Sequence, residues 1–179
     1  IIGAGTAGLA SARILAQQGH RVSLFEKAEQ LENVGAGLLL QPSGLAVFEH
    51  LGVLGSALNL GAPVSGLEGR LADGHLLVNS HYHEVHPQSS GLGIHRATLC
   101  HVLMQGLQDY AIEWHMGVDV RQIQQQGEKI QLNGLSRDEQ ALRHSFDAVI
   151  IANGARSHLR PANWVKLDRP YPWGAAWCI

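Results

Sequence analysis

The chain opens with a glycine-rich turn that strongly limits how it can fold. Two apolar residues, Ile1 and Ile2, lead into Gly3, Gly5 and Gly8, which are spaced G-x-G-x-x-G. In this spacing the first glycine permits a tight turn, the second lets the backbone approach a pyrophosphate, and the third lets a helix pack on the strand. The N–H groups at the start of that helix favour an anion. The motif therefore predicts a strand, a turn and a helix that bind phosphate groups.

The residues after the turn extend this pattern. Residues 7–18 carry apolar side chains at helical spacing, Gly19 follows as a helix terminator, and residues 21–25 form a short apolar strand that ends at Glu26. An acidic residue about 20 positions after such a turn accepts hydrogen bonds from an adenosine ribose. Glu26 could also be only an exposed carboxylate at a strand end, but the order of strand, turn, helix, strand and acid favours a dinucleotide site.

Composition excludes several classes of protein. The chain has 179 residues, of which 45% are hydrophobic and 16% are charged, and its net charge is −2. This balance gives no electrostatic reason to expect a nucleic acid partner. Cys100 and Cys178 lack the spacing of a metal-binding or redox motif. No apolar run is long enough to span a bilayer, and we expect a cytoplasmic protein.

The first strand is unusually short at its start. Only two residues precede the first turn, where a buried strand usually has about five, so we expect the chain to be a fragment.

Periodicity and turn residues predict the elements that follow Glu26. A second glycine turn spans residues 34–37, and Ser43 resembles the N-cap of a helix that ends near Leu51. The remaining expected elements are a hairpin within residues 67–86, a helix that ends near residue 108, a third parallel strand at 112–115, antiparallel strands at 118–120, 129–132 and 142–146, and a buried strand at 146–152 that is apolar on both faces.

Three histidines in the expected hairpin raise the alternative of a metal site. His81 and His83 would share one face of a strand, but His86 would not, and no second group of ligands is evident. A polar strand edge is therefore favoured, and no metal is predicted.

Four separated stretches together resemble one family of enzymes. They are the glycine turn with Glu26, Gly35-Ala36-Gly37 before a Leu-x-Gln-Pro run, His95-Arg96-Ala97-Thr98-Leu99, and Ile151-Ala152-Asn153-Gly154-Ala155-Arg156-Ser157-His158-Leu159-Arg160. In this order they resemble FAD-dependent monooxygenases of the para-hydroxybenzoate hydroxylase type, which include salicylate and ubiquinone-pathway hydroxylases. The resemblance implies an α/β fold: an FAD-binding, Rossmann-like parallel sheet of the glutathione-reductase type with an antiparallel meander, followed by the start of a β-sheet substrate domain.

The resemblance also implies which residues bind FAD. The turn would hold the pyrophosphate, Glu26 the adenosine ribose, Lys27 would lie beside the adenine, and Val120 would contact the adenine through its backbone. Arg96 would reach the ribityl or pyrophosphate region, because a guanidinium suits a phosphate oxygen. The full set of implied cofactor-binding residues is Gly3, Gly5, Thr6, Ala7, Gly8, Glu26, Lys27, Gly37, Arg96, Val120, Ala152, Asn153 and Gly154.

One position departs from the family pattern. Asn153 replaces the aspartate that in the family touches both FAD and the pyrophosphate of the nicotinamide donor, and an amide brings no charge to that contact. Arg156 and Arg160 could supply charge to the donor or could be solvated residues at a helix start.

The implied activity is that of an NAD(P)H-dependent aromatic-type monooxygenase, which inserts one oxygen atom from O₂ through a flavin hydroperoxide. No catalytic side chain is assigned, because the cofactor carries the chemistry. The alternatives are a flavin-binding fragment or module without turnover of its own, and an FAD-dependent reductase or halogenase on the same fold. We expect the FAD-binding domain at residues 1–164, with a strand insertion at about 65–92, and the start of a truncated substrate domain at residues 165–179. The expected partners are O₂ and a small, aromatic substrate.

Overall fold

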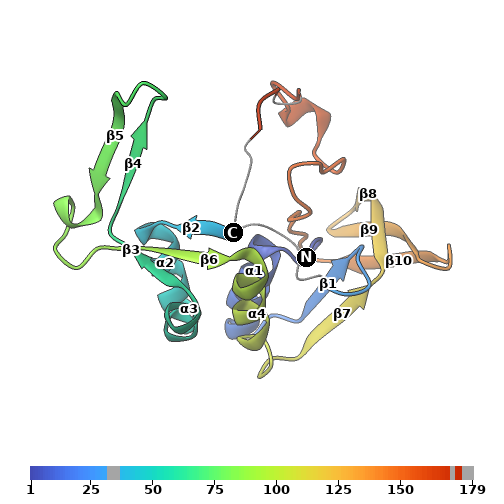
Figure 1. Cartoon of the computed structure of the whole chain (residues 1–179). Helices are drawn as coiled ribbons and strands as arrows, with labels where there is room; N and C mark the ends of the chain where they lie inside the picture. Colours follow the sequence, from blue (N-terminus) through green and yellow to red (C-terminus); the bar gives the residue numbers. More distant parts are fainter. Residues whose placement is uncertain (32–36, 170–171, 175–179) are drawn as a thin grey trace. The chain divides into compact units, whose positions relative to one another are not determined.

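The computed structural model describes residues 1–31, 37–169 and 172–174 (Figure 1). The chain divides into two compact units. The first unit comprises residues 1–32 and 107–177, and the second comprises residues 33–106 with 178–179. Residues 34–36 of the second glycine turn, and residues 170–171 and 175–179 of the expected start of a substrate domain, lie outside the described residues. Among the described helices, none combines the length and the apolar character needed to cross a membrane.

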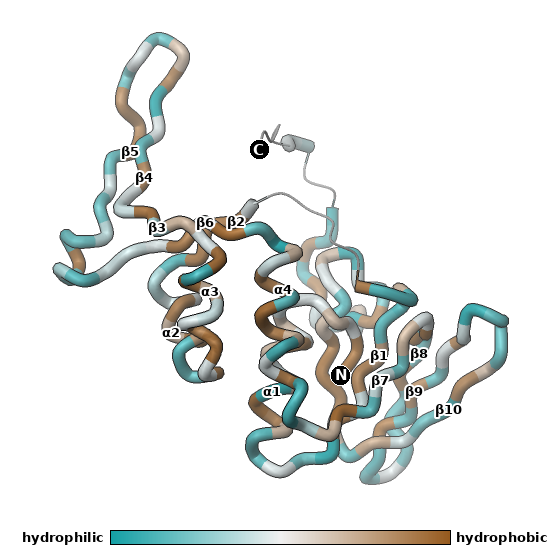
Figure 2. Tube along the Cα trace, turned by 60° about the horizontal axis from the view of Figure 1, so that its bottom comes forward, coloured by the Kyte–Doolittle hydropathy of each residue, from teal (hydrophilic) through white to brown (hydrophobic). Residues whose placement is uncertain are grey.

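The first unit combines parallel pairing with an antiparallel meander. Its elements are α1 (Thr6–Gln17), β1 (Val22–Glu26), β7 (Ile112–Met116), β8 (Val118–Gln126), β9 (Lys129–Ser136), β10 (Ala141–Phe146) and the 3₁₀ turn η2 (Ala162–Trp164). Strand β1 pairs with β7 in parallel, as predicted, and β8, β9 and β10 form an antiparallel sheet in the order β10-β9-β8. Figure 2 shows that hydrophobic and hydrophilic residues alternate along parts of these three strands, as expected for a sheet with one covered face.

The core of the first unit lies between the parallel pair and the meander. One cluster of buried residues there comprises Ile2, Phe25, Val118, Val120 and Leu132. Ile2 connects the segments, because it bridges Phe25 on one side and Ile151 on the other, both in parallel. The residue that enters the glycine turn is therefore fixed from both sides, and this sets the position of the turn.

The prediction of a buried strand at residues 146–152 is wrong in both the extent and the burial of that strand. Phe146 ends β10, and the later pairing is a single bridge, in which Ile2 N donates to Ile150 O at 2.9 Å and Ala152 N donates to Ile2 O at 2.7 Å. Ile150 and Ile151 remain 37% and 38% exposed. Gly3, with a φ of +99°, turns the chain away directly after Ile2, which ends the pairing on that side.

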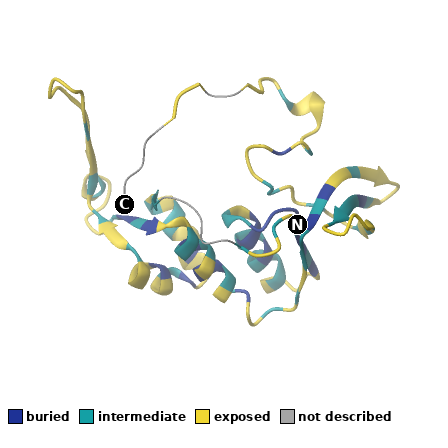
Figure 3. Ribbon diagram, turned by 45° about the vertical axis from the view of Figure 1, so that its right-hand side comes forward, coloured by how far each residue is buried: buried dark blue, intermediate teal, exposed yellow. Residues whose placement is uncertain are grey.

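In its described residues, the second unit contains three helices, a three-stranded sheet and a hairpin. Its elements are β2 (Gly37–Leu40), α2 (Pro42–His50), α3 (Leu54–Leu60), β3 (Ala62–Val64), β4 (Gly66–Arg70), β5 (Leu76–His81), the 3₁₀ turn η1 (Tyr82–Glu84), β6 (Gly91–His95) and α4 (Arg96–Gln105). The sheet order is β2-β6-β3, and β4 pairs with β5 in the predicted hairpin. Figure 3 shows that the outer part of this hairpin is exposed.

Two helix boundaries in the second unit differ from the sequence prediction. Helix α2 begins at Pro42 with Gln41 as its N-cap, so Ser43 is not the cap. Proline fits the first helical position, because its ring presets the helical φ and its missing N–H would have no partner there. Helix α4 ends at Gln105, with Gly106 as its C-cap, and not near residue 108.

Candidate functional site

The three glycines of the first turn are required for different reasons. Gly3 has a φ of +99°, and a Cβ there would lie 2.5 Å from the carbonyl oxygen of Ala152. A Cβ on Gly8 would lie 1.8 Å from the carbonyl oxygen of Gly3, so α1 packs directly against the turn. Both positions exclude any larger residue, and both confirm the structural roles predicted from the spacing.

Gly5 differs from the other two glycines, because nothing lies within 4 Å of the place where its Cβ would be. It is the N-cap of α1, and no side chain caps this end of the helix. The first N–H groups of a helix have no partner inside the helix, and the dipole there is positive. Thr6 is half-buried and Ala7 is exposed. The turn therefore leaves open space beside unpaired donors, as a bound pyrophosphate requires.

Glu26 accepts a hydrogen bond from the glycine turn through one carboxylate oxygen and from the residues after β1 through the other. Ala4 N donates to Oε2 at 2.8 Å, and Ala28 N donates to Oε1 at 2.9 Å. Each oxygen retains a second acceptor site for a hydroxyl donor. The sequence predicted a ligand role for this residue but missed its contact with the turn, since no local pattern links residues 22 positions apart.

Asn153 and Gly154 lie against the same turn. A Cβ on Gly3 would be 2.8 Å from the Cα of Asn153, and Gly154 has a φ of +85° that favours glycine. The Oδ1 atom of Asn153 is buried and has no hydrogen-bond partner within the described part of the chain. Such an acceptor is costly in a folded protein unless a ligand or a water molecule pairs with it.

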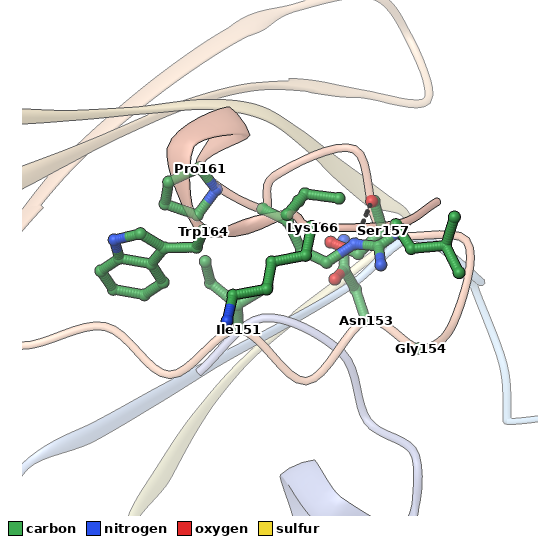
Figure 4. A pocket seen from close by; sticks show the side chains of 10 residues that line it. Ile151, Asn153, Gly154, Ser157, Pro161, Trp164 and Lys166 are labelled. Carbon is green, nitrogen blue, oxygen red and sulfur yellow. Dashed lines mark hydrogen bonds between the residues drawn. The ribbon is translucent and has the colours of Figure 1, made fainter. Parts of the chain in front are cut away.

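A cavity of about 630 Å³ adjoins these residues within the first unit (Figure 4). Its lining comes from one stretch of chain, with Asn153 and Gly154 at one part and Trp164 and Pro161 at another. Burial is slight here, since Trp164 is 77% exposed. The cavity is therefore an open hollow on the surface and not an enclosed void in the core.

Val120 and Lys27 occupy different environments. Val120 is 4% exposed and packs in the core with Ile2 and Phe25, so only its backbone is available to a ligand. The register of β8 with β9 shifts directly after Val120. Lys27 is exposed and follows β1 directly, next to Glu26.

The second unit brings together two of the predicted residues. Gly37 in β2 pairs with His95 in β6, and Arg96, the next residue, is exposed and opens α4. Burial raises the pKa of the Cys100 thiol, one turn later in α4, while the charge of Arg96 opposes that rise. Gly37 therefore pairs with the residue that directly precedes Arg96.

Sequence reasoning missed a cluster of aromatic rings in the first unit. His115 stacks on Phe25 with the ring centroids 4.3 Å apart, and His144 packs edge-on against His115 at 4.9 Å. Glu113 lies 3.3 Å from His115 and accepts a 2.6 Å hydrogen bond from Ser23 Oγ. The Ser23 hydrogen bond is the main cause that lowers the pKa of Glu113, and the histidines add to it. No group of three or more potential ligands within the described ranges could hold a metal ion.

Comparison with known proteins identifies a flavin-related family. The profile of the FAD binding domain family matches residues 1–173. Relatives include 2-heptyl-3-hydroxy-4(1H)-quinolone synthase of Pseudomonas aeruginosa, which is 28% identical over 99% of this chain and 45% of that protein. FAD-dependent monooxygenase OpS4 of Beauveria bassiana is 28% identical over 97% of this chain and 41% of that protein. The chain thus spans less than half the length of these relatives.

Solved structures with the same fold include flavin enzymes. PqsL of P. aeruginosa, crystallised with 2-aminobenzoylacetate, is 27% identical and has a TM-score of 0.76 over 96% of this chain and 47% of that one. p-Nitrophenol 4-monooxygenase PnpA of Pseudomonas putida has a TM-score of 0.79 at 18% identity, over 88% of this chain and 40% of that one, and shows the fold alone. These matches confirm the predicted α/β fold, FAD as the cofactor and the resemblance to FAD-dependent monooxygenases.

Proposed function

Because the chain belongs to the FAD binding domain family, we propose that it is the flavin-binding part of an NAD(P)H-dependent monooxygenase that acts on small aromatic molecules. The observation that carries this proposal is the open, uncapped start of α1 beside Gly5, which leaves backbone donors facing free space. Relatives that are named as a quinolone synthase and a 3-hydroxybenzoate 6-hydroxylase support the aromatic substrate class. We further propose a cytoplasmic setting.

The residues of the first unit fit FAD by their chemistry. We assign the pyrophosphate to the backbone of Gly3, Gly5, Thr6, Ala7 and Gly8, and the adenosine ribose to Glu26, whose oxygens each keep an acceptor site. Lys27 and the backbone of Val120 are assigned to the adenine. The orphaned Oδ1 of Asn153, between Ala152 and Gly154, is available to a hydroxyl or amide donor of the cofactor.

The second unit contributes two further residues to the proposal. We assign Arg96 to a phosphate oxygen or the ribityl chain, because a guanidinium is a fixed fork of donors, and Gly37 to close backbone approach beside it. When bound, the flavin supplies the redox chemistry by accepting a hydride and activating O₂. The residues named here bind and orient the cofactor, and no side chain among them is assigned a proton transfer.

The test is steady-state turnover of the full-length enzyme with FAD bound. NADH or NADPH oxidation and O₂ uptake are measured with a panel of phenolic and aminobenzoic acids. Oxidation that an aromatic compound stimulates, together with a hydroxylated product, supports the proposal. A yellow, flavin-loaded protein that no aromatic compound stimulates would refute the monooxygenase assignment.

The second candidate is a flavin-binding module without turnover of its own. Asn153 favours it, because an uncharged amide stands where the family has an aspartate that contacts the donor's pyrophosphate. The two candidates are separated by Asn153→Asp. If the wild type binds FAD without oxidising NAD(P)H and the Asn153→Asp variant gains this oxidation, the result supports a flavin-binding module without turnover of its own.

A further inference from the structure

One face of the β2-β6-β3 sheet is turned away from the helices of the second unit. Helices α2 and α3 lie on the other face (Figure 1), where Leu92 and Ile94 of β6 are only 1% and 4% exposed. Side chains alternate along a strand, so Gly93 between them faces the opposite way. Gly93 pairs with Leu39 and therefore shares that opposite face with it, and Gly37, two residues earlier in β2, lies on the same face.

Tyr82 also lies on this face, although it comes from the turn η1. A Cβ on Gly91 would be 3.0 Å from Cε2 and 3.1 Å from Oη of Tyr82, and 2.9 Å from Cδ1 of Leu39. Gly91 is two residues from Gly93 in β6, so its missing side chain makes room for the ring on the face that carries Leu39. The phenol ring and Gly37 are therefore on the same side of the sheet.

The hydroxyl of Tyr82 fixes the side-chain amide of Gln41. Oη donates to Oε1 of Gln41 at 2.7 Å, and Gln41 is the N-cap residue of α2. This bond turns the amide oxygen toward the tyrosine. The two N–H donors on Nε2 have no hydrogen-bond partner among the residues that the structure describes. A strand rises about 3.3 Å per residue, so Gln41 lies about 13 Å along the sheet from Gly37.

We propose that Gln41 and Tyr82 determine substrate specificity, by recognising a carboxylate on the aromatic substrate of the proposed monooxygenase. Nε2 of Gln41 donates to the carboxylate, and Tyr82 holds the amide in the orientation that this requires. A carboxylate suits these donors, because hydrogen bonds to a charged acceptor are stronger than those to a neutral one. The aromatic ring would then lie toward Gly37, which is assigned to the cofactor. The inference rests on the proposed function, since it names how that site selects its substrate.

The decisive variant is Gln41→Glu in the full-length enzyme with FAD bound. A glutamate oxygen still accepts the hydrogen bond from Tyr82, so the link between η1 and α2 is kept, but both N–H donors give way to a negative charge. Gln41→Leu removes the donors without adding charge, and Tyr82→Phe removes only the hydroxyl. Tyr110→Phe is the matched control, because Tyr110 belongs to the first unit, where its ring contacts Arg13.

The measured quantity is the dissociation constant, from equilibrium dialysis, of 3-hydroxybenzoate against 3-methylphenol and of 2-aminobenzoate against 2-methylaniline. Within each pair a methyl group replaces the carboxylate, so the ratio of the constants isolates the contribution of the carboxylate. We expect the wild type to bind at least one acid more tightly than its methyl analogue. Gln41→Leu should weaken binding of that acid by about 5- to 30-fold, Gln41→Glu by more, and Tyr82→Phe by about 2- to 5-fold. Binding of the methyl analogue should not change.

A ratio of acid to methyl analogue in Gln41→Glu that equals the wild-type ratio would overturn the proposal, and the bond between Tyr82 and Gln41 would then be structural only. An equal effect of Tyr110→Phe and Tyr82→Phe on the ratio would overturn it too. A flavin-loaded wild type that binds acids and methyl analogues equally well would contradict this inference but not the proposed function. A flavin-loaded wild type that binds none of these compounds would contradict both.

Discussion

Substitution of Glu26 tests two roles of one side chain at once. In the ligand-free chain its carboxylate accepts hydrogen bonds from Ala4 N and Ala28 N, at 2.8 Å and 2.9 Å. Ala4 is 1% exposed, so Glu26→Ala leaves a buried N–H unpaired, whereas the half-buried Ala28 N–H can be hydrated. An unsatisfied buried donor costs about 1–3 kcal/mol, and we expect the free energy of unfolding to fall by that amount.

The same variant should also weaken FAD binding. Loss of a hydrogen bond between the carboxylate and a ribose hydroxyl corresponds to about 1–3 kcal/mol, which is roughly 5- to 150-fold in the dissociation constant. Glu26→Gln should recover only part of the lost stability and of the lost FAD affinity. Its amide nitrogen is itself a donor, so it cannot accept a hydrogen bond from one of the two backbone N–H groups.

The assays are urea unfolding of the ligand-free chain and an equilibrium titration with FAD, monitored by flavin fluorescence. Glu29→Ala is the matched control, because Glu29 is exposed and its ion pair with Arg137 is a surface contact worth at most about 1 kcal/mol. Wild-type stability in Glu26→Ala would refute the turn-holding role. Wild-type FAD affinity in the same variant would remove Glu26 from the proposed site.

Three further predictions follow from particular contacts. Gly8→Ala should unfold the first unit or destabilise it strongly, because its Cβ would lie 1.8 Å from a carbonyl oxygen. Gly5→Ala, in contrast, should show wild-type urea unfolding but a lower affinity for FAD in a fluorescence titration. Asn153→Asp should lower the ligand-free melting temperature at pH 7, since it buries a charge at an unpaired acceptor, and equal stability would contradict that reasoning. The hydrogen bond from Ser23 lowers the folded-state pKa of Glu113, so its stabilisation is present above the ordinary pKa of 4.5 and is lost as pH falls through the lowered value. Ser23→Ala should therefore destabilise the chain more at pH 6 than at pH 3 in urea titrations, and an equal effect at both pH values would exclude this linkage.

The sequence predicted the elements whose causes are local. The glycine turn, helix α1 and strand β1 follow from residue type and spacing, and so do the parallel strand β7 and the three strands of the meander. The two wrong helix ends and the shortened pairing at Ile151 depend on what neighbouring segments allow. Gln41 occupies the N-cap position of α2 because Pro42 fits the first helical position, and the turn at Gly3 ends the pairing of Ile2 with Ile151 on one side.

The contacts that complete the site could not be predicted in the same way. Glu26 reaches Ala4 only because Ile2 is bridged beside Phe25, which is a result of folding and not a pattern along the chain. One missed feature did have a signal: His144 and Phe146 are two residues apart in a strand, which places both rings on one face.

An amide NMR titration of the ¹⁵N-labelled chain with FAD tests directly whether the glycine turn binds the pyrophosphate. At 19.3 kDa the chain suits this measurement, which reports on each backbone N–H separately. We expect saturable shifts of the amide resonances of Gly5, Thr6, Ala7 and Gly8, because their N–H groups would face the pyrophosphate. FAD binding that leaves these four resonances unmoved, or no binding at all, would refute the proposal that this turn holds the cofactor.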